Sequence, residues 1–237
     1  MRAGGLRAAL GLCGLATVAV LAAAGAGVSQ EGGPAARILD KAPPALPLAG
    51  APPGWEVREF SGKASVSVVR VDETVALRLL SEGNSFAVTR SLDFDLPKYP
   101  ILTWKWKVTT LPKGGDVRKR ETDDAVQVYV LFPRGLVKAV QSHIVGYIWD
   151  ATAPAGTRLD SPQPCPPTCN LKLIVLQSGG GSLGQWVAER RNVLEDYRAL
   201  FGGAPPKVGG LSVQLDSNDT KSSAEVFFQD FVFQTER

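Results

Sequence analysis

The sequence predicts an all-β fold, a two-sheet antiparallel sandwich of jelly-roll type with one amphipathic helix near residues 192–201. Three observations lead to this prediction. About ten short segments rich in β-branched and aromatic residues follow one another, bounded by Gly, Pro, Asn or Asp. Several of them alternate apolar and polar side chains, as half-buried strands do. One late stretch has helical periodicity instead. A barrel is the alternative arrangement of the same strands.

The alternation also predicts which side chains face the core. We expect the strands at 55–60, 64–71, 74–80, 85–92, 101–108, 124–132, 143–150, 171–178, 210–216 and 224–234. In 101–108, Trp104 and Trp106 face one way and Lys105 faces the other. Similar alternation in two further strands predicts a sheet with one buried side and one side that carries Lys, Gln and Tyr.

The predicted helix has clear start and stop signals. Asn192 is a good N-cap, Glu195 three residues later completes a capping box, and Gly202 suits the left-handed C-terminal position. The charged run 189–191, Glu-Arg-Arg, stands just before the cap and indicates either ligand binding or ion pairing. The apolar stripe of the helix consists of Val193, Leu194, Tyr197, Leu200 and Phe201.

The N-terminal stretch 1–26 has the pattern of a secretory signal peptide. Arg2 and Arg7 precede an apolar run, and Ala24-Gly25-Ala26 matches a cleavage site, so we expect export to the periplasm or the outside. An uncleaved membrane anchor is the alternative. Cleavage would lower the formal net charge from +3 to about +1, which does not suggest a nucleic-acid partner. Residues 27–54, rich in Ala, Pro and Gly, are predicted to be a linker, and 55–237 a single domain.

The cysteines and the acidic loops restrict the chemistry. In an exported chain, Cys165 and Cys169 are expected to form a short structural disulfide. The single histidine, His143, makes both a zinc site and a Ser-His-Asp site improbable, and no cofactor is expected. The Asp- and Asn-rich loops at 114–124 and 216–221 are predicted to form Asx turns, with a structural calcium ion as the alternative.

The chain resembles the domain-of-unknown-function family 3047, which consists of exported bacterial proteins. The resemblance runs from Trp55 to Phe233 and rests on LTWKWKV, LPKGGD, TDDAVQVYVLFP, GYIWD, ERRNVLEDYRALFG, DSNDT and AEVFFQDFVF, in that order. It implies little about activity. The last strand also looks like the closing strand of carbohydrate-binding jelly rolls, which is an analogy of fold and not of function.

Three classes of function fit these features. We expect a non-catalytic binding module of the cell envelope with a glycan-like ligand, because aromatic rings stack on sugars while polar groups bind their hydroxyls. A structural or assembly protein of the envelope is the second class. The third is a polysaccharide-acting enzyme that uses two of the carboxylates Asp123, Asp124, Glu189 and Asp196. The expected ligand-binding residues are Lys105, Asp124, Gln127, Tyr129, Tyr147, Trp149, Glu189, Arg191 and Gln214.

Overall fold

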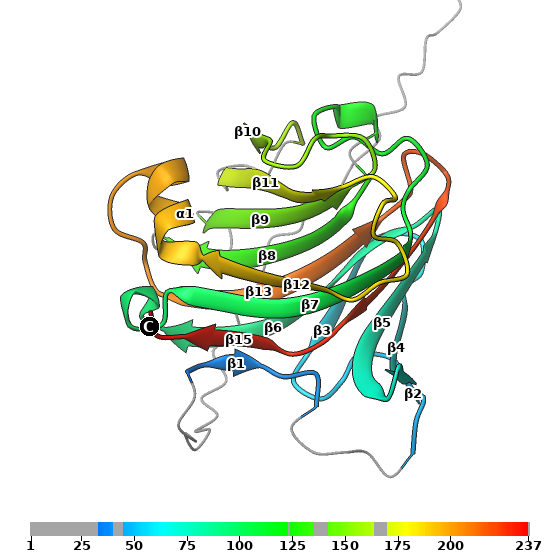
Figure 1. Cartoon of the computed structure of the whole chain (residues 1–237), viewed down its shortest axis with the longest axis horizontal. Coiled ribbons are helices and arrows are strands. Elements are labelled where there is room, and N and C mark those ends of the chain that lie inside the picture. The colour runs from blue at the N-terminus through cyan, green and yellow to red at the C-terminus, as the bar shows by residue number, and fades with distance from the viewer. Residues whose placement is uncertain (1–32, 40–44, 123, 135–141, 164–169, 237) are drawn as a thin grey trace, which may run out of the picture.

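The computed structural model describes residues 33–39, 45–122, 124–134, 142–163 and 170–236 and shows two stacked β-sheets (Figure 1). The predicted jelly-roll-like sandwich with one α-helix is confirmed. One sheet has the order β1-β15-β7-β14-β5-β4-β2, with β12 on the free edge of β7. The other has the order β10-β11-β9-β8-β13-β6-β3. All their pairings are antiparallel except that of β9 with β11.

The bounds of the elements agree with most of the predicted strands. The eight-stranded sheet contains β1 (Ala35–Ala36), β2 (Leu48–Ala49), β4 (Ser65–Val71), β5 (Thr74–Glu82), β7 (Ile101–Thr110), β12 (Val187–Asn192), β14 (Ser223–Phe228) and β15 (Phe231–Gln234). The seven-stranded sheet contains β3 (Glu56–Ser61), β6 (Ser85–Phe94), β8 (Val126–Pro133), β9 (Ser142–Asp150), β10 (Arg158–Asp160), β11 (Asn170–Ser178) and β13 (Val208–Asp216). The helices are η1 (Leu96–Lys98), η2 (Arg120–Thr122) and α1 (Val193–Phe201).

Aromatic side chains fill the space between the sheets. Trp104 and Trp106 point inward from β7, as their alternation predicts, and meet Tyr147 and Trp149 of β9. The ring centroids lie 5.4 Å apart for Trp104 and Tyr147 and 5.5 Å apart for Trp106 and Trp149. Because Tyr147 and Trp149 are fully buried, they belong to the core and not to a ligand-binding surface, which corrects the expectation for both.

The predicted last strand is two strands. β14 and β15 both pair with β7, but the chain leaves the ladder at Gln229 and Asp230 between them. There the Gln229 N–H donates to the Lys105 carbonyl oxygen over 3.0 Å. On its other edge β14 pairs with β5, whereas β15 pairs with β1. The interruption therefore separates two halves of the sheet beside Lys105.

The packed domain begins before Trp55. Residues 35–36 and 48–49, both within the predicted linker, form β1 and β2 at the edges of the eight-stranded sheet. Ile38 is only 1% exposed, and the Trp55 indole N–H donates to the Arg37 carbonyl oxygen over 2.9 Å. Strands of two residues have no recognisable periodicity, so they form here because the sheet edges offer hydrogen-bond partners.

The helix has the predicted N-cap and ends at the predicted glycine. Among the described residues, no hydrogen bond from the Glu195 side chain completes the capping box, and Gly202 has a positive φ with an extended ψ of 158°. The Asn192 side chain accepts a hydrogen bond from the Glu195 N–H, and Gly202 ends the helix at a φ of 72°. Val193 and Tyr197 are buried, while Leu194, Leu200 and Phe201 pack against the core. Within the described part of the chain, none of the helices has the length and apolar character needed to cross a membrane.

Candidate ligand-binding site

The charged run before the helix lies on a strand, β12. It pairs antiparallel with β7, with Glu189 opposite Trp104 and Arg190 opposite Thr103. Successive side chains of a strand point to opposite faces. Glu189 and Arg191 therefore face the space between the sheets together with the tryptophans of β7, while Arg190 faces outward. The three charges that stand side by side in the sequence belong to two different environments.

On the inner side, Arg191 forms an ion pair within the fold. Its Nη2 and Nε donate to Asp196 Oδ1 and Oδ2 over 2.6 and 3.0 Å, and the Tyr147 hydroxyl donates to Oδ2 over 2.9 Å. The Asp196 side chain is 5% exposed and the Arg191 side chain 28%. Burial and the neighbouring Asp196 carboxylate both raise the pKa of the Tyr147 hydroxyl, which stays protonated as a donor. The arrangement is a satisfied structural network.

Glu189 is also satisfied on the inner side. Its Oε1 accepts hydrogen bonds from Gln177 Nε2 over 2.8 Å and from Trp106 Nε1 over 3.2 Å. Burial raises the pKa of the Glu189 carboxyl, and the two hydrogen bonds work in the opposite direction. The side chain thus joins β12 to β7 and β11 across the open edge of the sandwich.

Asp124, one of the expected ligand-binding residues, lies apart from Arg191 and the other charges of β12, which corrects its assignment to a common site with them. Its Oδ1 and Oδ2 accept hydrogen bonds from the backbone N–H groups of Asp219 and Thr220 over 3.3 and 2.6 Å. It is fully buried there, because the start of β8 lies beside the end of β13. Asp124 therefore holds the loop between β13 and β14, and Asp123 lies outside the described residues.

The outer face of the seven-stranded sheet carries Gln127, Tyr129 and Gln214, with the two glutamines paired across β8 and β13. This face is covered and not open: Gln127 is 4% exposed and Tyr129 8%. The Tyr129 ring lies over Gly146 of β9, where an added Cβ would approach its Cε1 to 2.8 Å. Since Lys105 belongs to the other sheet, the polar face predicted from these residues does not exist as one surface.

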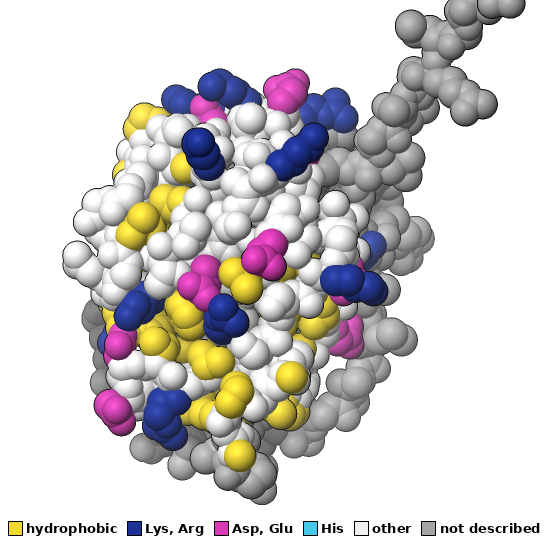
Figure 2. Space-filling model, turned by 90° about the vertical axis from the view of Figure 1, so that its right-hand side faces the viewer, with side chains coloured by type: hydrophobic (Ala, Val, Ile, Leu, Met, Phe, Trp, Pro, Cys, Tyr) yellow, Lys and Arg dark blue, Asp and Glu magenta, His cyan; other side chains and the backbone are white. Residues whose placement is uncertain are grey.

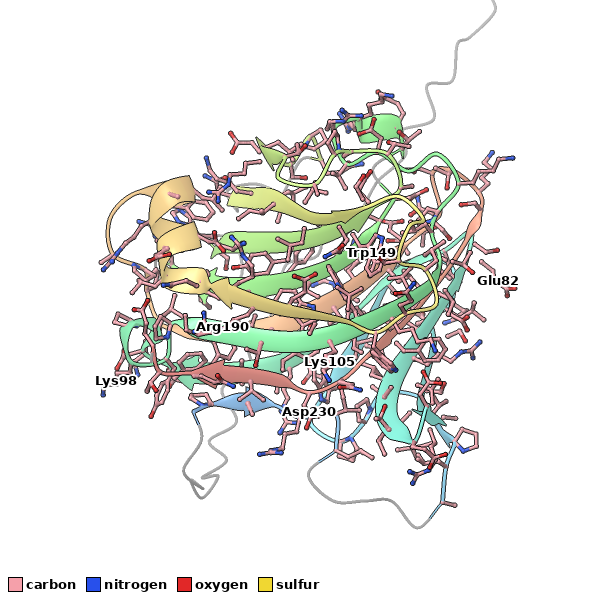
Figure 3. The ribbon with its side chains drawn as sticks, viewed as in Figure 1. Glu82, Lys98, Lys105, Trp149, Arg190 and Asp230 are labelled. Carbon is pink, nitrogen blue, oxygen red and sulfur yellow. The ribbon has the colours of Figure 1, made fainter. Side chains whose placement is uncertain are left out.

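A hollow of about 670 Å³ lies on the outer face of the eight-stranded sheet, around the interruption between β14 and β15. Figure 3 shows Arg190, Lys105 and Asp230 in this region, on β12, on β7 and at the interruption, whereas Lys98 lies apart from them near η1. Trp104 and Glu189 border it but turn their side chains inward. The outward-facing lining consists of Ile38, Leu39, Thr74, Val75, Thr103, Lys105, Ala188, Arg190, Gln229 and Asp230.

The two cations of the hollow have no side-chain partner in the part of the chain that the structure describes. Among the described residues, none forms a hydrogen bond or an ion pair with the side chain of Lys105 or Arg190. The acid of the hollow is already engaged, because the Asp230 carboxylate accepts from the Ile38 N–H over 2.6 Å and lies 3.7 Å from the Arg37 guanidinium. The hollow therefore combines an apolar floor with uncompensated positive charge.

An indole lies beside the hollow on the same face. Trp186 immediately precedes Val187, which pairs with Trp106, so it stands across from Lys107. The Trp186 Nε1 and the Lys107 Nζ both donate to Asp72 Oδ2, over 3.0 and 2.6 Å. Our sequence reasoning missed Trp186, Arg190 and Gln229. The alternation of Trp186, Ala188 and Arg190 would have indicated a common face once 187–192 was read as a strand.

Two further observations concern acidic clusters and surface charge. The described residues hold no group of three or more His, Cys, Asp or Glu placed to bind a metal ion. Figure 2 shows the end of the sandwich near β4 and β5, where the described Lys and Arg side chains are interspersed with Asp and Glu and form no extended basic surface. Cys165 and Cys169 lie outside the described residues, so their bridge stays a prediction.

Comparison with known families identifies the chain at the level of family. The family described as "Protein of unknown function (DUF3047)" matches residues 53–232. The chain belongs to this family. The match confirms the resemblance seen in the motifs, and DUF3047 itself carries no assigned activity. No curated protein matches the chain in sequence.

Solved structures of similar shape come from carbohydrate-active proteins. A family 11 carbohydrate-binding module of Clostridium thermocellum is 9% identical, with a TM-score of 0.46 over 88% of this chain and 99% of that one. The xyloglucanase domain of NopAA from Sinorhizobium fredii is 8% identical, with a TM-score of 0.48 over 82% and 100%. Endoglucanase cel12A from Rhodothermus marinus is 10% identical, with a TM-score of 0.46 over 81% and 99%. Similarity this low gives no information on ligand or reaction.

Proposed function

We propose that this DUF3047 protein is a non-catalytic binding module whose ligand is a glycan, held in the hollow on the outer face of the eight-stranded sheet. The observation that carries the proposal is the hollow itself, with its apolar floor and two cations that have no partner among the described residues. Its volume is within the range of about 300–1,000 Å³ that is typical of ligand sites. The site differs from the predicted one, of which it keeps Lys105.

The lining suits a sugar chain in three respects. Leu39, Val75 and Ala188 give apolar contact for the C–H faces of a sugar ring. Lys105 and Arg190 offer N–H donors to sugar hydroxyls, and Gln229, whose amide nitrogen donates to Thr74 Oγ1 over 3.2 Å, keeps its amide oxygen as an acceptor. The neighbouring Trp186 adds an aromatic surface at one side, and indole rings are well suited to stack on sugars.

Binding without catalysis is favoured by the state of the carboxylates. Glycoside hydrolysis uses two carboxyl groups that flank the scissile bond. Of the four carboxylates suggested by the sequence, Asp124, Glu189 and Asp196 are each held by hydrogen bonds inside the fold. The one carboxylate that turns its side chain toward the hollow, Asp230, is bound to the Ile38 N–H. These contacts support a fixed binding surface.

Export remains part of this proposal. It rests on the signal-like stretch 1–26, which lies outside the described residues. Intact mass of the processed protein should show cleavage after Ala26 and a loss of two hydrogen atoms for a Cys165–Cys169 bridge. A mass that retains the first 26 residues would favour the membrane anchor.

Glycan binding is tested by filling the hollow with a bulky side chain. Ala188 is exposed on β12 within the hollow, so Ala188→Trp should block it, while Ala199→Trp, on the exposed side of α1, is the matched control. Binding to a panel of neutral and acidic polysaccharides is measured by affinity electrophoresis and calorimetry. We expect the wild type and Ala199→Trp to bind at least one polymer and Ala188→Trp to bind it at least about tenfold more weakly, a difference of 1.4 kcal/mol.

Two results would contradict the proposal. One is the absence of binding to every polymer of the panel by the wild-type protein. The other is equal loss in both tryptophan variants, which would place the effect outside the hollow. Release of reducing sugar ends by the wild type would instead show that the module is an enzyme.

A further inference from the structure

We infer that the glycan held in the hollow is anionic, a polysaccharide whose carboxylate or sulfate groups lie between Lys105 and Arg190. This inference rests on the proposed function and adds the class of ligand. Neither the predicted site nor the family description points to acidic sugars.

The register of β12 on β7 brings the two cations together. Ala188 pairs with Lys105 and Arg190 pairs with Thr103, so Arg190 and Lys105 occupy diagonal positions on the same outward face. Diagonal neighbours on two antiparallel strands lie about 7–8 Å apart. Two side chains as long as Lys and Arg can reach one anionic group from that separation, and the guanidinium can do so with two parallel hydrogen bonds.

Two other cations on the outer face of this sheet are compensated by acids. On the same sheet face, Lys107 pairs with Asp72 over 2.6 Å and Arg78 with Glu225 over 2.6 Å. Lys105 and Arg190 differ from these because the described residues provide no acid for either. The acids that border the hollow are not available to them, since Glu189 turns inward and Asp230 is bound by the Ile38 N–H.

The apolar floor strengthens this preference. An ion pair formed over Ile38 and Val75 is partly shielded from water, and a charged pair is stronger where the local dielectric constant is lower. A neutral sugar would leave both cations to be desolvated without compensation, which costs free energy. An acidic sugar supplies the missing charge, so the hollow should discriminate by charge as well as by shape.

The ligand comparison uses polymers that differ only in charge. Polygalacturonate is compared with its methyl-esterified form, in which the carboxylates are neutralised, and dextran sulfate is compared with dextran. The first pair tests carboxylate and the second tests sulfate as the source of the anion. We expect at least one anionic polymer to bind about tenfold or more tightly than its neutral counterpart, and its affinity to fall as salt rises from 0.05 to about 0.5 M.

The variants test the two named side chains. Lys105→Gln and Arg190→Gln should each weaken binding of the anionic polymer roughly tenfold or more, the usual effect of a lost hydrogen bond to a charged group. Lys98→Gln and Arg198→Gln remove a charge from exposed positions outside the hollow and should change affinity by less than about twofold. Thermal melts of all four variants should match the wild type, since none of these side chains has a partner to lose.

The possible failures are distinguishable. If neutral and anionic polymers bind equally and Ala188→Trp still blocks them, the hollow is a glycan site without charge selection, and only this inference is overturned. If anionic polymers bind but Lys98→Gln and Arg198→Gln weaken them as much as the hollow variants do, binding reflects net charge, and the inference fails as well. If no polymer binds, the proposed function fails with it.

Discussion

The two sides of β12 differ in how their charges are compensated. On the inner side, Glu189 and Arg191 find partners within the fold, in Gln177 and in Asp196. On the outer side, Arg190 and its neighbour Lys105 have none among the described residues. Adjacent residues of one strand therefore have opposite tasks: the inner charges fasten the open edge of the sandwich, and the outer ones are free for a ligand.

The difference shows why a charge cluster in a sequence is ambiguous. Of the two interpretations of the Glu-Arg-Arg run, ion pairing is confirmed for Arg191, whereas ligand binding is our proposal for Arg190. The alternation of the strand assigns the tasks. Substitutions on the inner side should alter stability, and they are given from the largest expected effect to the smallest. The last measurement compares Arg191 on the inner side with Arg190 on the outer side.

The largest effect is expected at the acid of the inner network. Asp196→Ala removes the acceptor shared by Arg191 and Tyr147 and leaves a half-buried guanidinium and a buried hydroxyl unpaired. Breaking a buried ion pair in this way should lower the free energy of unfolding by about 3–5 kcal/mol. Urea denaturation measures the change. Asp230→Ala, at the more exposed acid of the hollow, is the control and should cost about 1 kcal/mol.

A smaller effect is expected where β12 turns into α1. The Asn192 side chain caps the helix by accepting from the Glu195 N–H, and Asp196 stands in the first turn. Asn192→Ala should lower the free energy of unfolding by about 1 kcal/mol, and Asn192→Ser should restore most of it. Equal stability of the alanine and serine variants would show that the cap does not fix this turn.

The smallest effect concerns His143, which joins β9 to α1. Its Nδ1 lies 2.8 Å from the Tyr197 hydroxyl, and its ring stacks on Phe201. Burial, then the positive charges of Arg134 and Lys172, lower its pKa to about 4. The unfolded chain, with a histidine pKa of about 6.5, binds more protons between pH 6.5 and 4, so stability should fall as the pH falls through that window.

Because His143 is partly exposed, solvent screening should limit this loss to about 1 kcal/mol. Urea melts at pH 7 and pH 4.5 measure it, and His143→Gln serves as the control without a titrating ring. A wild-type slope equal to that of His143→Gln over this range would contradict the assigned role. Carboxylates with lowered pKa values, such as Asp116, contribute mainly below pH 4.

Most of the fold was predictable because its signals are local. The residues of alternating strands such as β7, and those of the capped helix α1, show the period of the element by themselves. The structure confirms both elements. The elements that escaped prediction depend on their neighbours. β1 and β2 have only two residues each, and β12 contains three charged residues in succession. None of these three segments therefore has a strand pattern of its own, and each forms a strand because a neighbouring strand of the sheet pairs with it.

The candidate site was predictable only in part, for a topological reason. Lys105 was correctly assigned to a solvent-facing position, but Gln127, Tyr129 and Gln214 lie on the other sheet. Period-two alternation tells which residues share a face of one strand but not which strands share a sheet. Tyr147 and Trp149 are in the core because they project from β9, a strand of the seven-stranded sheet, into the space between the two sheets. The hollow exists because the chain leaves the ladder at Gln229 and Asp230.

The most direct test of the account compares two adjacent arginines. Arg190→Ala and Arg191→Ala are made in the same background, and each variant is examined by urea denaturation and by calorimetric titration with the tightest-binding polysaccharide. We predict that Arg191→Ala lowers the free energy of unfolding by about 2–4 kcal/mol while the folded protein still binds. Arg190→Ala should leave stability within about 0.5 kcal/mol of the wild type and weaken binding roughly tenfold. If both variants lost stability equally, or if binding depended on Arg191 alone, the division of tasks between the two sides of β12 would be contradicted.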